Sequence, residues 1–119
     1  MSNTVHRIQS FGFKWDHVGP VASTVIDCRD VDNPYHLPEL RPMTGLSYRV
    51  QEYVYHDVNA QWVLATAWGY YVEGHTNISF GCTGGHHRSV ALAEAFSKML
   101  NAVHQPNIVT HLHIDKESY

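Results

Sequence analysis

The sequence predicts a single α/β domain, a layered α/β/α arrangement with a mixed sheet that contains a strand–phosphate loop–helix unit. Three observations lead to this prediction. Short β-branched segments alternate with longer segments of helical periodicity, a glycine-rich run joins one such pair, and the length of 119 residues suits one domain. A chain of this size can bury a core without support from metals or disulfides.

Four segments have the composition of strands. They are residues 5–13, 23–28, 77–82 and 107–113. The second is β-branched and apolar, as expected of a strand buried within a sheet, and the third is a short strand. The last alternates its side chains between two faces. Because parallel strands end at one edge of a sheet, we expect Asp27 and Arg29 to lie near Cys82.

Three segments have helical periodicity. They are residues 47–56, 60–72 and 87–103. The third is the clearest, since its apolar side chains recur at helical spacing and would face a core: Leu92, Phe96, Met99 and Val103. Residues 29–46 contain three prolines and are predicted to form a long ordered loop with at most short helical turns. Loops of this length in compact domains are usually functional.

The charge balance argues against a long polyanionic partner. The chain has 8 lysines and arginines against 11 aspartates and glutamates, and a net charge of −3 with histidine neutral, whereas nucleic-acid binders are usually basic. A small anion in one locally positive pocket remains compatible with this balance. No apolar run has the length of a membrane span, residues 1–4 do not resemble a secretion signal, and two cysteines make no disulfide framework, so we expect a cytosolic protein.

The run at residues 81–89, Gly-Cys-Thr-Gly-Gly-His-His-Arg-Ser, is predicted to bind phosphate or a similar anion. Gly84 and Gly85 lack side chains, so the backbone can curl and direct successive N–H groups at a ligand. The helix that follows adds free N–H groups and the positive end of its dipole, and Arg88 offers a guanidinium fork for two phosphate oxygens. Four further side chains can donate, and the two histidines add charge when protonated: Thr83, His86, His87 and Ser89.

The same run resembles the Cys-x5-Arg signature of cysteine-dependent phosphatases, which leaves an enzymatic alternative open. In that chemistry a Cys82 thiolate would attack phosphorus while the loop amides and Arg88 hold the oxygens. A general acid is also needed, and no spacing singles out one among Asp16, Asp27 and Asp30. We therefore favour binding over catalysis, and no cofactor is expected.

Other features have simpler interpretations. His111 and His113 would share a strand face that a metal could use, but no third ligand is marked, so a half-exposed strand is favoured and no metal is expected. Trp62 and Trp68 are expected in the core or in a subunit contact rather than as a stacking platform for bases. Cys28 is expected to be a small buried hydrophobe.

A longer set of motifs occurs in order along the chain. It comprises Phe11-Gly12-Phe13-Lys14, Asp27-x-Arg29, Asn33-Pro34-Tyr35, Glu39-Leu40-Arg41-Pro42-x-Thr44-Gly45-Leu46, Glu73-Gly74, the run from Gly81 to Val90, and Glu94. Together they resemble the C-terminal domain of the RNase adapter protein RapZ over residues 11–109. The run Gly-Cys-Thr-Gly-Gly-x-His-Arg-Ser-Val is the most specific part of the resemblance.

The resemblance implies a non-catalytic domain that senses glucosamine-6-phosphate, binds a regulatory small RNA and self-associates. It maps the phosphosugar pocket onto the glycine-rich run and one tyrosine of the proline-rich loop: Thr83, Gly84, Gly85, His87, Arg88 and Tyr35. Full-length members of this family also carry an N-terminal P-loop domain, and no Gly-x-x-x-x-Gly-Lys-Ser/Thr run occurs here. We therefore interpret the chain as similar to the second domain standing alone.

These inferences combine into one expected site and a set of expected partners. The ligand-binding residues are Cys82, Thr83, Gly84, Gly85, His86, His87, Arg88 and Ser89, with Arg29, Tyr35 and Arg41 closing over the sugar. The expected partners are a phosphorylated small molecule and further copies of the chain. A phosphorylated nucleotide is an alternative ligand, since the loop reads only the phosphate. RNA is a further alternative, which the negative charge and the acidic C-terminal end disfavour.

Overall fold

The computed structural model describes residues 4–116. Residues 1–3 and 117–119 lie outside this range, and with them most of the N-terminal segment and of the acidic C-terminal end considered above. The elements in chain order are β1 (His6–Gly12), β2 (Thr24–Asp27), the 3-10 turn η1 (Pro34–His36), α1 (Tyr48–Tyr55), α2 (Val58–Val72), β3 (Asn77–Cys82), α3 (Arg88–Ala102) and β4 (Asn107–His111). Strands thus alternate with helices, and the predicted α/β class is confirmed.

The four strands form one sheet in the order β2-β3-β1-β4. Each of the three pairings is parallel, so the expected mixed sheet is corrected to a parallel one across the described residues. Every connection between paired strands is long enough to return the chain to the same end of the sheet, which parallel pairing requires. The register sets Asp27 beside Gly81 and Gly12 beside Cys82, so β1, β2 and β3 finish together.

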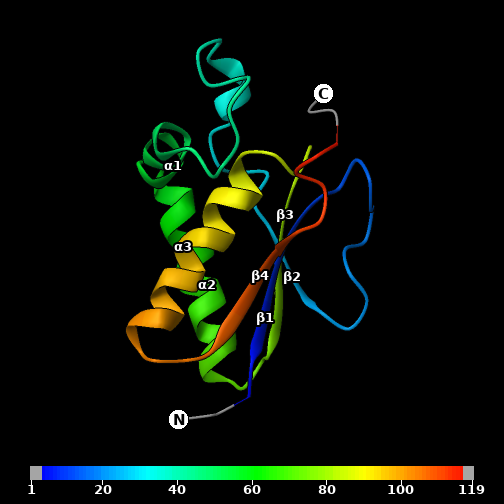
Figure 1. The fold of residues 1–119 in the computed structure, drawn as a ribbon, viewed down its shortest axis with the longest axis vertical. Helices are drawn as coiled ribbons and strands as arrows, with labels where there is room; N and C mark the ends of the chain where they lie inside the picture. The colour runs from blue at the N-terminus through cyan, green and yellow to red at the C-terminus, as the bar shows by residue number, and fades with distance from the viewer. Residues whose placement is uncertain (1–3, 117–119) are drawn as a thin grey trace.

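All three helices lie on one side of the sheet (Figure 1). Helix α3 is central and contacts β1, β3 and β4. The other face carries residues 13–23, where a layered α/β/α arrangement would have had helices, and Gly19 in this segment lies against Phe11 and Val25. Its local hydrogen bonds suit a turn rather than a helix, since a carboxylate oxygen of Asp16 accepts from the amide of Gly19 at 3.0 Å.

The hydrophobic core lies between the sheet and the helices, with buried residues from α1, α2 and α3. The rings of Phe80 and Phe96 meet there with centroids 5.7 Å apart, and Cys28 is buried among the same apolar residues, as predicted. The helical periodicity of α3 correctly places Leu92 and Phe96 inside. It fails for Val103, which is 37% exposed because the helix ends at Ala102 and the chain turns away.

Candidate anion-binding site

The loop between β3 and α3 begins where three strands end. The amide of Cys28 donates to the carbonyl of Gly81 at 2.7 Å, which confirms that the ends of β2 and β3 lie side by side. The amide of Phe13 donates to the carbonyl of Cys82 at 2.8 Å, so the end of β1 is also attached to this loop. The first turn of α3 follows directly, with His87 as its N-cap residue.

Glycines let backbone segments come into close contact around this loop. A Cβ at Gly12 would lie 2.6 Å from the carbonyl carbon of Gly84, and Gly85 has a φ of +78°. Gly45, at the end of the proline-rich segment, donates its amide to the carbonyl of His86 at 2.8 Å. The sequence predicted the turn at Gly84 and Gly85, but the need for glycine at positions 12 and 45 comes from contacts with distant segments.

The main-chain amides of the loop have no acceptors among the residues that the structure describes. From Thr83 to Val90, none donates a hydrogen bond to a residue in the described part of the chain. The first N–H groups of any helix lack partners within that helix, and anions are a common acceptor for them. The loop therefore presents free donors together with the positive end of the α3 dipole.

Arg88 is buried, with 4% of its surface exposed. Its Nη1 donates to the carbonyl oxygens of Arg29 at 2.8 Å and Val31 at 3.1 Å, and its Nη2 donates to the hydroxyl of Thr83 at 3.3 Å. All three acceptors are uncharged. No carboxylate lies within ion-pair distance of Arg88 among residues 4–116, and Asp27 interacts with it electrostatically only from beyond that distance. The guanidinium therefore has no directly bound counter-charge among these residues, which is unusual for a buried cation.

Unpartnered buried nitrogens concentrate in three consecutive residues. Within the described residues, five buried side-chain nitrogen or oxygen atoms have no hydrogen-bond partner, and four of them belong to His86, His87 and Arg88. These atoms are Nε2 of His86, both ring nitrogens of His87, and Nε of Arg88. Buried polar atoms without partners are rare and call for an explanation such as a bound ion or water.

Burial lowers the pKa of His87, and the neighbouring His86 lowers it further. Backbone groups of Arg41, Met43 and Leu40 act in the opposite direction, although none of them has hydrogen-bond geometry with a ring nitrogen. The neutral imidazole is therefore favoured in the unliganded protein at neutral pH. The positive charge that the sequence allowed at this position would need an anion beside the ring to stabilise it.

Cys82 is buried, and its thiol contacts the hydroxyl oxygen of Ser89 at 3.1 Å. The carboxyl group that lies closest in the sheet register, Asp27, is bound to Arg29 by hydrogen bonds of 2.8–3.2 Å. The Arg29 side chain is the main cause that holds the pKa of Asp27 below its usual value. Asp27 is thus ionised at neutral pH and unsuited to protonate a leaving group.

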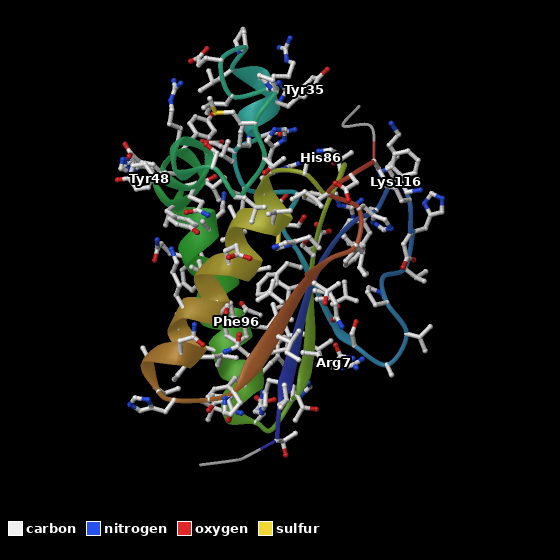
Figure 2. All side chains as sticks on the ribbon, viewed as in Figure 1. Arg7, Tyr35, Tyr48, His86, Phe96 and Lys116 are labelled. Carbon is white, nitrogen blue, oxygen red and sulfur yellow. The ribbon has the colours of Figure 1, made fainter. Side chains whose placement is uncertain are left out.

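The residues expected to close over a sugar are arranged as two local pairs. Asp27 and Arg29 form an ion pair of 2.8 Å with both side chains half exposed. Arg41 donates from Nε to the carbonyl of Tyr35 at 2.9 Å and lies over the Tyr35 ring, so it braces the proline-rich segment. Figure 2 shows Tyr35 and His86 at the end of the molecule where β3 finishes.

His111 and His113, which were expected on one half-exposed strand face, have separate hydrogen-bond partners. His111 contacts Ser10 at 2.6 Å and Glu94 at 2.8 Å. His113 lies beyond the end of β4 and accepts a hydrogen bond from the amide of Gly12 at 2.9 Å. Residues 4–116 contain no cluster of three or more potential metal-ligating side chains.

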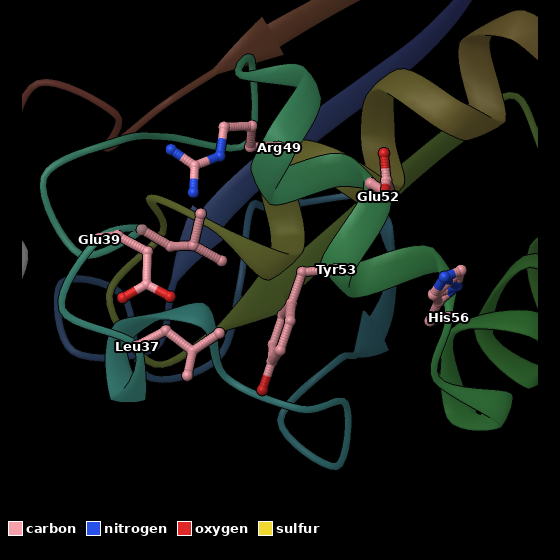
Figure 3. A pocket seen from close by; sticks show the side chains of 7 residues that line it. Leu37, Glu39, Arg49, Glu52, Tyr53 and His56 are labelled. Carbon is pink, nitrogen blue, oxygen red and sulfur yellow. The ribbon is translucent and has the colours of Figure 1, made fainter.

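A hollow of about 280 Å³ lies between the proline-rich segment and α1 (Figure 3). Its lining residues are Leu37, Glu39, Leu40, Arg49, Glu52, Tyr53 and His56. The sequence did not predict it, because its two walls meet only in the tertiary structure. None of its lining residues comes from the loop at residues 81–89, so it is a separate feature.

The chain is similar to a known protein family and to several known proteins. A family model described as the RapZ C-terminal domain matches residues 4–115. The chain is 39% identical over 121 residues to a nucleotide-binding protein of Streptomyces griseus, 40% over 121 residues to one of Lactobacillus acidophilus, and 38% over 122 residues to one of Thermus thermophilus.

These matches cover most of this chain but a minority of each relative. They span 92% of the chain and 36% of the Streptomyces griseus protein, 92% and 40% for Lactobacillus acidophilus, and 93% and 43% for Thermus thermophilus. The chain therefore spans about two-fifths of the length of the curated relatives it matches. Within residues 4–116, no helix combines the length and apolar character needed to cross a bilayer. By the match over residues 4–115, the chain belongs to the RapZ C-terminal domain family.

Proposed function

We propose that the loop at residues 81–89 binds the phosphate group of a small phosphorylated metabolite, with glucosamine-6-phosphate as the first candidate. The observation that carries the proposal is the cluster of unpartnered buried nitrogens in His86, His87 and Arg88. A phosphate would supply acceptors for these nitrogens and for the free amides of the loop at the same time. It would also supply a directly bound counter-charge, which the Arg88 guanidinium lacks among the described residues.

The remainder of the ligand would lie toward the proline-rich segment. Arg29, Tyr35 and Arg41 are available at the same end of the molecule, and the Tyr35 and Arg41 side chains already form a preorganised pair. Since the phosphate group is the part that the loop would read, a phosphorylated nucleotide is the main competing ligand. The relatives are named nucleotide-binding proteins, but they are more than twice as long as the matched region, so that name need not refer to this domain.

Calorimetric titration tests the proposal. We expect glucosamine-6-phosphate to bind more tightly than glucosamine, with inorganic phosphate binding weakly and nucleotides serving as the competing class. Substitution of Arg88 by lysine should weaken phosphate binding, whereas the matched substitution Arg49→Lys, in the separate hollow, should leave it unchanged. Equal affinity for glucosamine and glucosamine-6-phosphate would show that the loop does not read the phosphate.

Two other activities are distinguished by separate assays. The contact of the Cys82 thiol with Ser89 favours phosphatase chemistry as a second candidate, and turnover of a chromogenic phosphomonoester that is lost in Cys82→Ser would support it. RNA binding as an adapter would appear as association that weakens steeply as salt is raised.

The free, unpaired state of Cys28 and Cys82 supports the accompanying proposal of a cytosolic location.

A further inference from the structure

Another hollow, of about 320 Å³, lies at the end of the sheet where the strands begin. Figure 1 shows the start of β1, the end of α2 and the link from α3 to β4 together at this end of the molecule. The seven residues of β1 span about 20 Å, and Gly12 at their far end lies against Gly84 of the anion loop. The hollow is therefore remote from the proposed phosphate site. Its lining residues are His6, Tyr71, Val72, Gly74, Thr76 and Gln105.

Main-chain hydrogen bonds join the walls of this hollow. The amide of His6 donates to the carbonyl of Pro106 at 2.9 Å, which attaches the start of β1 to the link between α3 and β4. The amide of Arg7, labelled in Figure 2, donates to the carbonyl of Thr76 at 2.8 Å and attaches β1 to the segment before β3. The walls are thus fixed by the sheet itself, as is usual for small-molecule sites, which are largely formed before the ligand arrives.

Gln105 is 2% exposed, and its polar atoms are engaged within the chain. Its Nε2 donates to the carbonyl oxygens of Thr4 at 2.7 Å and Pro106 at 3.2 Å. Its Oε1 accepts from the hydroxyl of Tyr71 at 3.3 Å, so α2 is also attached to this wall. Gln105 thereby shows the normal behaviour of a buried polar side chain, which is to find partners nearby.

His6 is 5% exposed and departs from this behaviour. Its ring packs edge-on against the ring of Tyr71, with centroids 5.3 Å apart. Within residues 4–116, neither ring nitrogen of His6 has a hydrogen-bond partner. Neither nitrogen is sealed off, since both are absent from the unpartnered atoms that lack accessible surface. Because His6 lines the hollow, the surface that its nitrogens keep opens into it.

The polar groups around the hollow carry no formal charge. Its lining includes no aspartate, glutamate, lysine or arginine. Burial lowers the pKa of His6, so its imidazole is neutral at pH 7 and offers one N–H donor and one acceptor. A charged ligand would lose hydration here without gaining a counter-charge. The hollow therefore favours uncharged groups that both donate and accept hydrogen bonds.

We propose that this hollow binds a small uncharged ring molecule that carries hydroxyl or amide groups, with His6 as its main polar contact. Hydroxyl and amide groups each donate and accept, which matches the two nitrogens of a neutral imidazole. Tyr71 and Val72 supply apolar surface for the body of the ring. Ligand pockets are about 300–1,000 Å³, so a hollow of about 320 Å³ suits a single ring.

Titrations followed by NMR test the proposal with probes that differ in charge. Benzamide is neutral, benzoate is an anion of nearly the same shape, and benzamidine is the matching cation at pH 7. We expect benzamide to shift the Tyr71 ring and Thr76 methyl signals saturably, with benzoate and benzamidine binding at least tenfold more weakly. Glucose, a neutral ring with hydroxyl groups, distinguishes a sugar-like from an amide-bearing ligand. Absence of saturable shifts with both neutral probes, or equal affinity for the three benzene derivatives, would overturn the proposal.

Substitutions at His6 test its role as the polar contact. His6→Phe keeps a flat ring against Tyr71 but removes both nitrogens, so it should unfold at the same or a higher urea concentration while binding benzamide at least tenfold more weakly. His6→Gln restores a neutral donor and acceptor and should recover most of the affinity. The control is His17→Phe, at an exposed position on the opposite face of the sheet, which should bind like the parent. Parent-like binding by His6→Phe would remove His6 from the site.

A substitution at the rim tests the charge preference without changing His6. Val72 lines the hollow and is 68% exposed, so Val72→Glu should remain folded by circular dichroism. The new carboxylate should favour benzamidine over benzamide, the reverse of the order expected for the parent. An unchanged order would show that the probes bind elsewhere. Since no residue of the loop at 81–89 lines this hollow, these outcomes are independent of phosphate binding.

Discussion

Arg88 donates a hydrogen bond from Nη1 to the main-chain oxygen of Arg29 at 2.8 Å, joining the start of α3 to the end of β2 across 59 residues of sequence. The guanidinium is therefore held by carbonyl groups and not by a carboxylate. Carbonyl oxygens can orient a cation but do not neutralise it, and Asp27 interacts with Arg88 only from beyond ion-pair distance. This edge of the sheet therefore keeps a positive charge that favours an anion.

Replacement of Arg88 by lysine separates charge from geometry. Lysine keeps the charge but cannot donate to both carbonyls and to a phosphate in the same arrangement. We expect at least tenfold weaker binding of inorganic phosphate by calorimetry, and a loss of about 2 kcal/mol in the free energy of unfolding by urea titration. Parent-like affinity in Arg88→Lys, with Arg49→Lys as the matched control, would contradict the assignment of Arg88 to the site.

The surroundings of Gly12, beside the loop, and of Gly69, in α2, predict opposite effects for two alanine substitutions. At Gly12 a Cβ would lie 2.6–2.8 Å from the backbone of Gly84 and Gly85, so Gly12→Ala should lower the free energy of unfolding by about 2 kcal/mol or more. At Gly69 a Cβ meets nothing within 4 Å, so Gly69→Ala should raise it by about 0.5–1 kcal/mol. Urea unfolding of both variants at a protein concentration too low for association gives the comparison.

Histidine burial predicts that mild acid lowers stability. Burial is the leading cause that lowers the pKa of His6, His87 and His113 in the folded state. The unfolded chain therefore binds more protons below about pH 6.5, and the free energy of unfolding should fall as pH decreases from 7.5 toward 5. In urea titrations across this range, His87→Gln should show a shallower decrease than the parent, and an unchanged slope would remove His87 from the explanation.

Anion binding should reverse the preference of His87 for its neutral form. An anion beside the ring stabilises the imidazolium, so binding should be coupled to proton uptake. Sulfate is a suitable probe because its own charge does not change between pH 6 and 8. We expect tighter sulfate binding at pH 6 than at pH 8 by calorimetry, with less of this difference in His87→Gln; equal pH dependence in both proteins would count against contact between the anion and this ring.

Thiol reactivity tests the choice between binding and catalysis. Cys28 and Cys82 are both buried, and burial is the main cause that raises the pKa of Cys28 well above its usual value. We expect neither thiol to react readily with a disulfide reagent in the folded protein, while both react after unfolding in urea. Rapid modification of Cys82 alone at neutral pH, absent from Cys82→Ser, would instead indicate an activated nucleophile.

The local pattern of the chain determined most of its elements and the position of the loop. Strand composition and helical spacing are short-range properties, so the strand at Asn77–Cys82 and the helix that follows could be predicted with nearly correct bounds. The turn at Gly84 and Gly85 was predictable for the same reason, since two consecutive glycines allow backbone conformations that other residues rarely adopt.

The tertiary structure decided what those elements contact. Parallel pairing throughout the sheet, the carbonyl acceptors of Arg88, and the need for glycine at Gly12 and Gly45 all depend on segments far apart in sequence. Trp62 was expected in the core or in a subunit contact, and only the structure shows that it is 68% exposed on this chain. Hydrophobic composition specifies that a side chain favours burial, but not which surface covers it. Local propensity acts over a few residues, whereas close packing and the pairing of buried polar groups are settled only when distant segments meet.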